Sequence, residues 1–509
     1  GFITSDFPNF FCMKCKNESI YGLCENCNEI CAKRHYCPRC DGFSSGKCVE
    51  HGIGLEYKNR RIDARHYFNA AKKIVKARVE ELPAAVKGVR GTSNESHICE
   101  NLAKGLLRAQ YNLNVNKDGT IRYDVTEMPI THFKPKEIRT KVEKLKELGY
   151  LKDIYGKELE SEEQILELFP HDIILPSCPD SDDEPADTVF FRVSKFIDDE
   201  LEKIYGLPRF FNLQRKEDLP GTLFACIAPH ICTATVGRLI GFSKTQTLLA
   251  SPYMHAAMRR DCDGDEAAVI LLMDMLLNFS RKFLPAHRGG TQDAPLVLNS
   301  KINAGEVDDQ ILDFECAKYP LELYELAEQG KHSSEIKIEN VRSRLREGKD
   351  PFANLAFTHD CFDINCGVVN SAYKSLPTMQ EKVERQMNLC SKIRAVDATD
   401  VARLIIERHF IRDIKGNFRK FSMQAFRCVD CNVKFRRPPL VGRCTSCGGK
   451  IIFTINEGGI IKYMQGALDL ARRFNVSSYL IECLDLTQRD IESIFGREKE
   501  KQENLGKWV

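Results

Sequence analysis

Residues 251–285 read SPYMHAAMRRDCDGDEAAVILLMDMLLNFSRKFLP. Within this stretch Asp261, Asp263 and Asp265 alternate, and Gly264 permits a sharp turn between the last two. Three carboxylates on one tight loop can converge on a divalent cation, because hard cations prefer oxygen ligands. We therefore interpret the run DCDGDE as a metal-binding loop.

Two other interpretations of this loop are weaker. A calcium EF-hand loop requires Gly at its sixth position and Glu at its twelfth. Counted from Asp261, those positions hold Glu266 and Leu272, so the EF-hand is excluded. A solvated acidic turn is the second alternative, but the acids stand between two arginines and the apolar run Ala267–Leu277, which we predict to be a buried helix. The pattern favours phosphoryl-transfer chemistry, in which carboxylates hold a divalent cation beside a reacting phosphate.

Basic residues precede the loop directly. Arg259 and Arg260 are predicted to neutralise phosphate oxygens, and His255 is a further candidate for phosphate or nucleic-acid contact. A structural ion pair with a loop aspartate is the alternative for either arginine.

Composition limits the class of protein. The chain has 509 residues, of which 43% are hydrophobic and 29% charged, with a formal net charge of +2. This length indicates several domains, and the near-neutral charge argues neither for nor against nucleic acid. The longest apolar run is too short to cross a bilayer, so we expect no membrane segment.

Of the 22 cysteines, 12 fall in two clusters, at residues 12–48 and 428–447. Both clusters contain Cys-x-x-Cys pairs in a large chain, which indicates metal binding in a reducing, cytoplasmic environment. Each pair presents two thiolates, two pairs complete a tetrahedral zinc site, and four protein ligands leave no open position, so the sites are structural. Cys31 and His35 are left over and could replace a member of either N-terminal set. The predicted zinc ligands are Cys12, Cys15, Cys24 and Cys27; Cys37, Cys40, Cys48 and His51; and Cys428, Cys431, Cys444 and Cys447.

The C-terminal cysteine module is strongly basic. Six basic residues and one acidic residue lie between Arg427 and Lys450, and Arg436 and Arg437 stand in the loop between the two cysteine pairs. A solvated basic face and a contact with a phosphate backbone both remain open.

Five segments of the chain closely resemble the large, catalytic subunit of archaeal family D DNA polymerase. The likeness extends over nearly the whole chain. The segments are HAAMRRDCDGDEAAVILLMDMLLNFSRKFLPAHRGGTQDAPLV (255–297), KDGTIRYDVTEMPITHFKPKEI (117–138), IAPHICTATVGRLIGF (227–242), KIRAVDA (392–398) and FRCVDCNVKFRRPPLVGRCTSCGGKI (426–451).

The resemblance implies an α+β multidomain chain with a double-psi β-barrel polymerase core, zinc-ribbon modules and a helical C-terminal region. It implies template-directed DNA synthesis on a primer-template from dNTPs, with catalytic Mg²⁺ held by Asp263 and Asp265. The zinc sites would scaffold the barrels. The family works with a separate small subunit that proofreads by 3′–5′ exonuclease activity.

Two departures from the family pattern bear on these expectations. The family usually has asparagine where this chain has Asp261, and three aspartates at this spacing resemble the loop of multisubunit RNA polymerases. Asp261 is therefore expected to add a third metal ligand. The family's large subunit also extends upstream of the first zinc module, where a barrel supplies basic catalytic residues. Because this chain lacks that region, the resemblance implies the C-terminal part of a large subunit that needs its upstream half to polymerise. The start Gly1-Phe2 without methionine suggests a fragment, a split gene or a processed product.

The C-terminal tail resembles a sliding-clamp binding peptide, with the alternative of a frayed charged tail. Gln502, Leu505 and Trp508 match its glutamine, aliphatic and first aromatic positions, whereas Val509 departs at the second aromatic. The predicted domains are residues 1–55 (two zinc modules), 56–170 (mixed α/β part of the core), 171–300 (catalytic barrel region with the aspartate loop), 301–424 (helical region), 425–455 (zinc ribbon), 456–500 (C-terminal helices) and 501–509 (clamp-binding-like tail).

Two alternative functions remain. A relative of two-barrel RNA polymerases is favoured by the three-aspartate loop, and ribonucleotide preference would identify it. A non-catalytic zinc-ribbon scaffold that binds DNA and recruits the clamp would tolerate loss of the loop aspartates.

Overall fold

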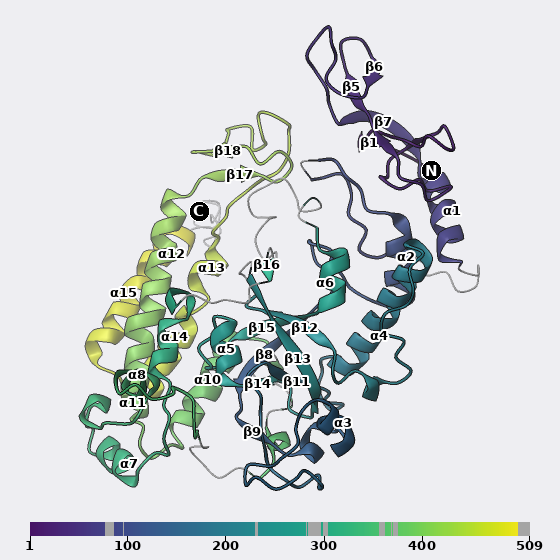
Figure 1. Ribbon diagram of the computed structural model, residues 1–509. Coiled ribbons are helices and arrows are strands. Elements are labelled where there is room, and N and C mark those ends of the chain that lie inside the picture. Colours follow the sequence, from purple (N-terminus) through teal and green to yellow (C-terminus); the bar gives the residue numbers. More distant parts are fainter. Residues whose placement is uncertain are drawn as a thin grey trace, which may run out of the picture. The chain divides into compact units, whose positions relative to one another are not determined.

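The computed structural model describes residues 1–76, 86–94, 96–229, 233–280, 282, 297–298, 304–355, 362–367, 369 and 375–496. The chain forms two compact units, Gly1–Lys318 with Ile338–Val369, and Tyr319–Lys337 with Asn370–Val509 (Figure 1). The helical region expected at 301–424 is therefore divided between the units. Residues 338–369 belong to the first unit because their backbone pairs with it, for example where the N–H of Val341 donates to the carbonyl of Phe314 at 3.0 Å.

Six strands of the first unit close into a barrel (Figure 1). Neighbours pair in the order β11, β14, β8, β15, β12, β13, and β13 pairs back with β11 in parallel, which closes the ring. Two further links, β14–β8 and β13–β16, are parallel, and the other pairings are antiparallel. The strands are β8 (Arg122–Pro129), β11 (Asp172–Pro176), β12 (Leu223–Ile227), β13 (Thr233–Ser243), β14 (Leu248–Ala250) and β15 (Glu266–Leu271), with β16 (Val297–Leu298) beside β13.

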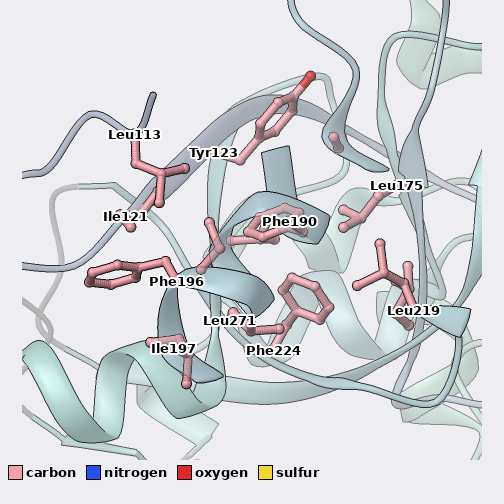
Figure 2. Close-up of a cluster of buried hydrophobic side chains, with 14 of the residues drawn as sticks. Leu113, Ile121, Tyr123, Leu175, Phe190, Phe196, Ile197, Leu219, Phe224 and Leu271 are labelled. Atoms are coloured by element: carbon pink, nitrogen blue, oxygen red, sulfur yellow. The ribbon is translucent and has the colours of Figure 1, made fainter. Parts of the chain in front are cut away.

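Alternate residues of all six strands meet in one buried cluster, as the two-residue period of a strand requires. Helix α4 (Ala186–Asp199) adds large side chains to this cluster. Phe190 and Phe224 lie close together there (Figure 2). Their rings meet edge to face, with centroids 4.7 Å apart and an angle of 83° between the ring planes. Burial of each such ring stabilises the fold by about 1.5–3 kcal/mol. The barrel strands contribute Val125, Ile173, Phe224, Leu239, Leu248 and Val269, among others.

The expectation of a buried helix over Ala267–Leu277 is only half right. Residues up to Leu271 form strand β15, and α6 (Leu272–Asn278) begins after it. β15 lies between β8 and β12 and is buried on both faces after its first residue. Its sequence therefore lacks the alternation of apolar and polar residues that marks a half-exposed strand. A short apolar run of this kind cannot be told from a helix by periodicity.

The N-terminal part of the first unit is built on short strands around the cysteines. β1 (Phe2–Pro8) pairs antiparallel with β7 (Tyr57–Asp63), and Asp63 caps α1 (Ala64–Val75). Between them lie β2 (Phe10–Phe11), β3 (Glu18–Ser19), β4 (Ala32–Lys33), β5 (His35–Cys37) and β6 (Gly42–Ser44). The remaining elements include α2 (Leu102–Gln110), β9 (His132–Phe133), α3 (Val142–Glu147), β10 (Leu166–Glu167), α5 (Pro252–Ala257) and α8 (Val341–Arg346).

The second unit is mainly helical. Ile406, Phe410 and Ile414 recur every four residues and are buried, which is the spacing of one helix face. The residues that the structure describes include no helix with the length and apolarity needed to cross a bilayer. The elements are α7 (Leu321–Glu328), α10 (Met379–Cys390), α11 (Ala398–Leu404), α12 (Ile411–Met423), β17 (Phe426–Cys428), β18 (Lys434–Phe435), β19 (Ile451–Ile452), α13 (Glu457–Ile461), α14 (Met464–Arg473) and α15 (Ser478–Phe495).

Candidate metal centre

The aspartate loop joins helix α5 to strand β15. Ser251 caps α5, its hydroxyl accepting from the N–H of Met254 at 3.2 Å. Cys262 has φ 72° and Gly264 has φ 103°, so the chain passes twice through the left-handed region within three residues. Only glycine adopts that region freely, which explains Gly264. This double turn brings the loop back over strand β8.

Three carboxylates meet at the loop. One side-chain oxygen each from Glu127, Asp261 and Asp263 lies within 4.8 Å of the others. Glu127 is buried, Asp261 is half-buried and Asp263 is exposed, so the cluster opens outward. Asp265 points elsewhere, because its Oδ2 lies 2.6 Å from Nη1 of Arg260. The structure thus brings together two of the three predicted aspartates and adds a glutamate.

The electrostatics of this cluster suit a divalent cation. Partial desolvation, a hydrogen bond with Asp261 and the charges of the neighbouring carboxylates raise the pKa of Asp263 above its ordinary value. Oδ1 of Asp261 is buried and has no hydrogen-bond partner within the described part of the chain. Mg²⁺ binds oxygens at about 2.0–2.1 Å, so opposite ligands lie about 4.2 Å apart. The residues therefore fit the ion with small side-chain adjustments.

Glu127 is the member of the cluster that the loop sequence did not reveal. It lies on β8, where the buried positions are Tyr123, Val125 and Glu127, with exposed residues between them. An acid in the inward register of a strand is unusual, because buried carboxylates require partners. That pattern is the signal that could have identified Glu127 from the sequence.

The basic residues before the loop already have partners. Nη2 of Arg259 lies 2.5 Å from Oε2 of Glu306, and Arg260 pairs with Asp265. His255 is fully buried, with Nδ1 2.6 Å from Oε2 of Glu127. As placed, His255 lies behind the loop and has no surface that a phosphate could reach.

The three sets of zinc-ligand candidates each come together. Sγ of Cys12 lies 3.5 Å from that of Cys27, Cys40 lies 3.5 Å from Nδ1 of His51, and Cys428 lies 3.4 Å from Cys447. A tetrahedral zinc at about 2.3 Å from each sulfur keeps the sulfurs about 3.8 Å apart. Ligand atoms within each set lie inside 4.8 Å of one another, so all three fit zinc: Cys12, Cys15, Cys24 and Cys27; Cys37, Cys40, Cys48 and His51; Cys428, Cys431, Cys444 and Cys447.

Backbone N–H groups in the turns favour the thiolate at the first cysteine of each N-terminal set, whereas hydrogen bonds with neighbouring thiols raise the pKa of Cys15 and of Cys40. The backbone N–H of Cys40 lowers the pKa of Cys37 to about 6, and that of Cys15 lowers the pKa of Cys12 to about 7. Thiolate is the form that binds metal.

Cys31 and His35 lie outside the ligand sets. The thiol of Cys31 is buried against the first set and points to the carbonyl of Glu29 at 3.9 Å. Nε2 of His35 lies 4.0 Å from Glu56.

The remaining predicted residues lie at the C-terminal end. Arg436 and Arg437 are exposed in the loop between the two cysteine pairs of the ribbon. Leu440 and Val441 follow them and are also exposed. The tail residues Gln502, Leu505, Trp508 and Val509 lie outside the residues that the structure describes.

Comparison with known proteins assigns the family. Residues 78–382, more than half of the chain, match the family described as DNA polymerase II large subunit DP2, catalytic domain. The chain is 44% identical over 503 residues to the DNA polymerase II large subunit of Archaeoglobus fulgidus, with 98% of this chain and 43% of the relative covered. It is 45% identical over 501 residues to that of Pyrococcus furiosus, covering 96% of this chain and 39% of the relative.

A third relative, the DNA polymerase II large subunit of Nanoarchaeum equitans, is 41% identical over 545 residues and covers 98% of this chain and 43% of its own length. The chain thus spans about two fifths of the length of these relatives. It belongs to the family of archaeal DNA polymerase II large subunits, also called family D.

Proposed function

We propose that this chain carries the catalytic metal site of a replicative DNA polymerase, which extends a primer 3′-hydroxyl on a DNA template. The observation that supports this most directly is the convergence of Glu127, Asp261 and Asp263 inside the region that matches the family's catalytic domain. A closed six-stranded barrel holds that cluster, which is consistent with a double-psi β-barrel core.

Asp261, Asp263 and Asp265 are the proposed Mg²⁺ ligands. When bound, Mg²⁺ would lower the pKa of the primer 3′-hydroxyl and stabilise charge at the α-phosphate of the dNTP. Asp265 can join the other two only if its pair with Arg260 opens. Its carboxylate is 42% exposed, so it has room to turn. Arg260, once released, would be free to neutralise a phosphate oxygen.

The three cysteine sets are proposed as structural zinc sites. Each offers four protein ligands and leaves no position for substrate. In the C-terminal ribbon, Arg436 and Arg437 are proposed to contact the phosphate backbone of DNA, since both are exposed.

The proposed partners follow from the family. The relatives are named large subunits, and we propose a smaller partner subunit with 3′–5′ proofreading exonuclease activity. The remaining part of the large subunit that the relatives carry is proposed to complete the active site. The tail residues Leu505 and Trp508 are proposed to anchor a sliding clamp, and we expect the complex to work in the cytoplasm.

Primer extension by the assembled complex tests the catalytic site. Asp263→Ala should lower the extension rate by about 10²–10³-fold, because it removes a proposed ligand that is needed in the transition state. The matched control is Asp124→Ala, since Asp124 is an exposed aspartate of β8 and should be dispensable. Unimpaired extension by Asp263→Ala would contradict the proposal and support the non-catalytic scaffold.

Nucleotide choice separates DNA from RNA synthesis. The same complex should incorporate dNTPs in preference to rNTPs on a primed DNA template. A preference for rNTPs would instead identify a two-barrel RNA polymerase relative, as the aspartate at position 261 allows.

A further inference from the structure

Glu127 holds the backbone of the aspartate loop. Its Oε1 accepts from the N–H groups of Gly264 and Asp265, each at 3.2 Å. Its own N–H donates to the carbonyl of Asp265 at 2.8 Å. The same residue therefore binds the turn through both its main chain and its side chain.

His255 supports Glu127 from behind. Both side chains are fully buried, and Nδ1 of His255 lies 2.6 Å from Oε2 of Glu127. The carbonyl of His255 accepts from the N–H of Arg260 at 2.9 Å, so the histidine also contacts the start of the loop. One carboxylate oxygen thus faces the loop and the other faces the histidine.

The loop needs such a support. Cys262 and Gly264 both have positive φ, and a non-glycine residue in that region is strained. The carboxylates of Asp261 and Asp263 also repel each other when no cation is bound. Backbone strain and carboxylate repulsion both destabilise this turn, so it persists only if surrounding groups hold its backbone.

We propose that Glu127, backed by His255, is a positioning residue that fixes the Gly264–Asp265 turn so that Asp261 and Asp263 face one cation. This inference rests on the proposed metal site. It assigns Glu127 a role distinct from that of the aspartates, because its Oε1 already accepts from two backbone N–H groups and its Oε2 faces the buried His255.

Amide hydrogen exchange of the loop in the zinc-loaded, magnesium-free 509-residue chain tests the role directly. Glu127→Ala should speed exchange of the peptide that contains Gly264 and Asp265 by about tenfold or more. Glu127→Gln should stay within about threefold of the parent, because a carbonyl oxygen can accept from both N–H groups. His255→Phe, which fills the space and removes Nδ1, should lie between them. Asp124→Ala on the exposed face of β8 is the control and should change nothing.

Two results would overturn the inference. Unchanged exchange in Glu127→Ala would show that the turn does not depend on this side chain. Exchange in Glu127→Gln as fast as in Glu127→Ala would show that the negative charge, and not acceptance of the N–H groups, holds the loop. Circular dichroism and zinc content of each variant exclude general unfolding.

Mn²⁺ binding to the same variants, followed by electron paramagnetic resonance, separates this inference from the proposed function. Asp263→Ala should abolish binding at the loop, Glu127→Ala should weaken it about tenfold, and Glu127→Gln should weaken it less. If Asp263→Ala left binding unchanged, the metal site would be wrong. If only Glu127→Ala left binding unchanged, the metal site would stand and the positioning role would fall.

Discussion

Nη1 of Arg260 lies 2.6 Å from Oδ2 of Asp265, which keeps the third aspartate of the loop away from the first two. Arg259, its neighbour, pairs instead with Glu306. The two arginines are adjacent in sequence, but only Arg260 forms an ion pair with a loop aspartate. Substitution of Arg259 is therefore a matched control for substitution of Arg260.

Arg260→Ala should tighten Mn²⁺ binding by the chain about 3- to 10-fold, because a removed unit charge near the site contributes on the order of 1 kcal/mol. Arg259→Ala, with its carboxylate partner outside the loop, should change the affinity by less than about twofold. Calorimetric titration measures both. Equal effects of the two substitutions, or weaker binding in Arg260→Ala, would show that Arg260 does not compete with the cation for Asp265.

Cys431→Ser should remove one of the three zinc ions that we propose for this chain. Cys431 lies 3.5 Å from Cys444 within the ribbon set, and loss of one thiolate leaves an incomplete tetrahedral site. Elemental analysis measures the zinc content. Cys366→Ser, an exposed cysteine outside the three sets, is the control and should keep all three ions. An unchanged zinc count in Cys431→Ser would rule out the ribbon site.

Joint replacement of Arg436 and Arg437 by alanine should weaken DNA binding and reduce its salt dependence. Two lost phosphate contacts lower the slope of log K against log salt by about 1.8. The control is the joint replacement of Arg385 and Lys392, two exposed basic residues of the same unit, by alanine. Fluorescence anisotropy at several salt concentrations provides the slopes. Equal slopes for both variants would contradict the phosphate contact and favour a basic surface that only contacts solvent.

Asp274→Asn should change how stability depends on pH. Complete burial raises the pKa of Asp274 to about 7, although it accepts hydrogen bonds from the N–H of Ile121 at 2.7 Å and from Asn278 at 2.8 Å. A raised carboxyl pKa stabilises the fold below the unfolded pKa of about 3.9, and this stabilisation is lost as the pH rises through about 7.

Between pH 6 and 8 the parent should therefore lose about 1.4 kcal/mol relative to Asp274→Asn, the equivalent of one pKa unit. Arg108 and Glu200 also face Asp274: the positive charge of Arg108 lowers the pKa of Asp274, and the negative charge of Glu200 raises it. Denaturant melts of the zinc-loaded chain at the two pH values measure the difference. A constant difference between the two proteins would show that Asp274 does not titrate in this range.

The candidate site was only partly accessible from sequence. The aspartate loop could be found because its three aspartates stand within five residues, and this spacing limits which atoms they can reach together. Glu127 lies more than 130 positions earlier and meets the loop through the pairing of β8 with β15. The sequence predicts a phosphate contact for His255, whereas in the fold its side chain is fully buried beside Glu127.

The fold shows the same division. Ala267–Leu277 reads as one apolar segment, and its change from strand to helix at Leu271 depends on β8 and β12 on either side. Neighbouring strands supply the hydrogen-bond partners that make Ala267–Leu271 extended.

Residue types at short spacing were enough to predict the three four-residue cysteine and histidine sets and the aspartate loop, and long matched segments were enough to identify the family. Tertiary structure decided the third carboxylate of the metal cluster, the pairing of Asp265 with Arg260 and the closure of the barrel by β13 on β11. Those relationships join residues that are distant in the chain or depend on side-chain direction. Strand pairing and side-chain packing bring these residues together, and local sequence patterns encode neither the pairing nor the packing.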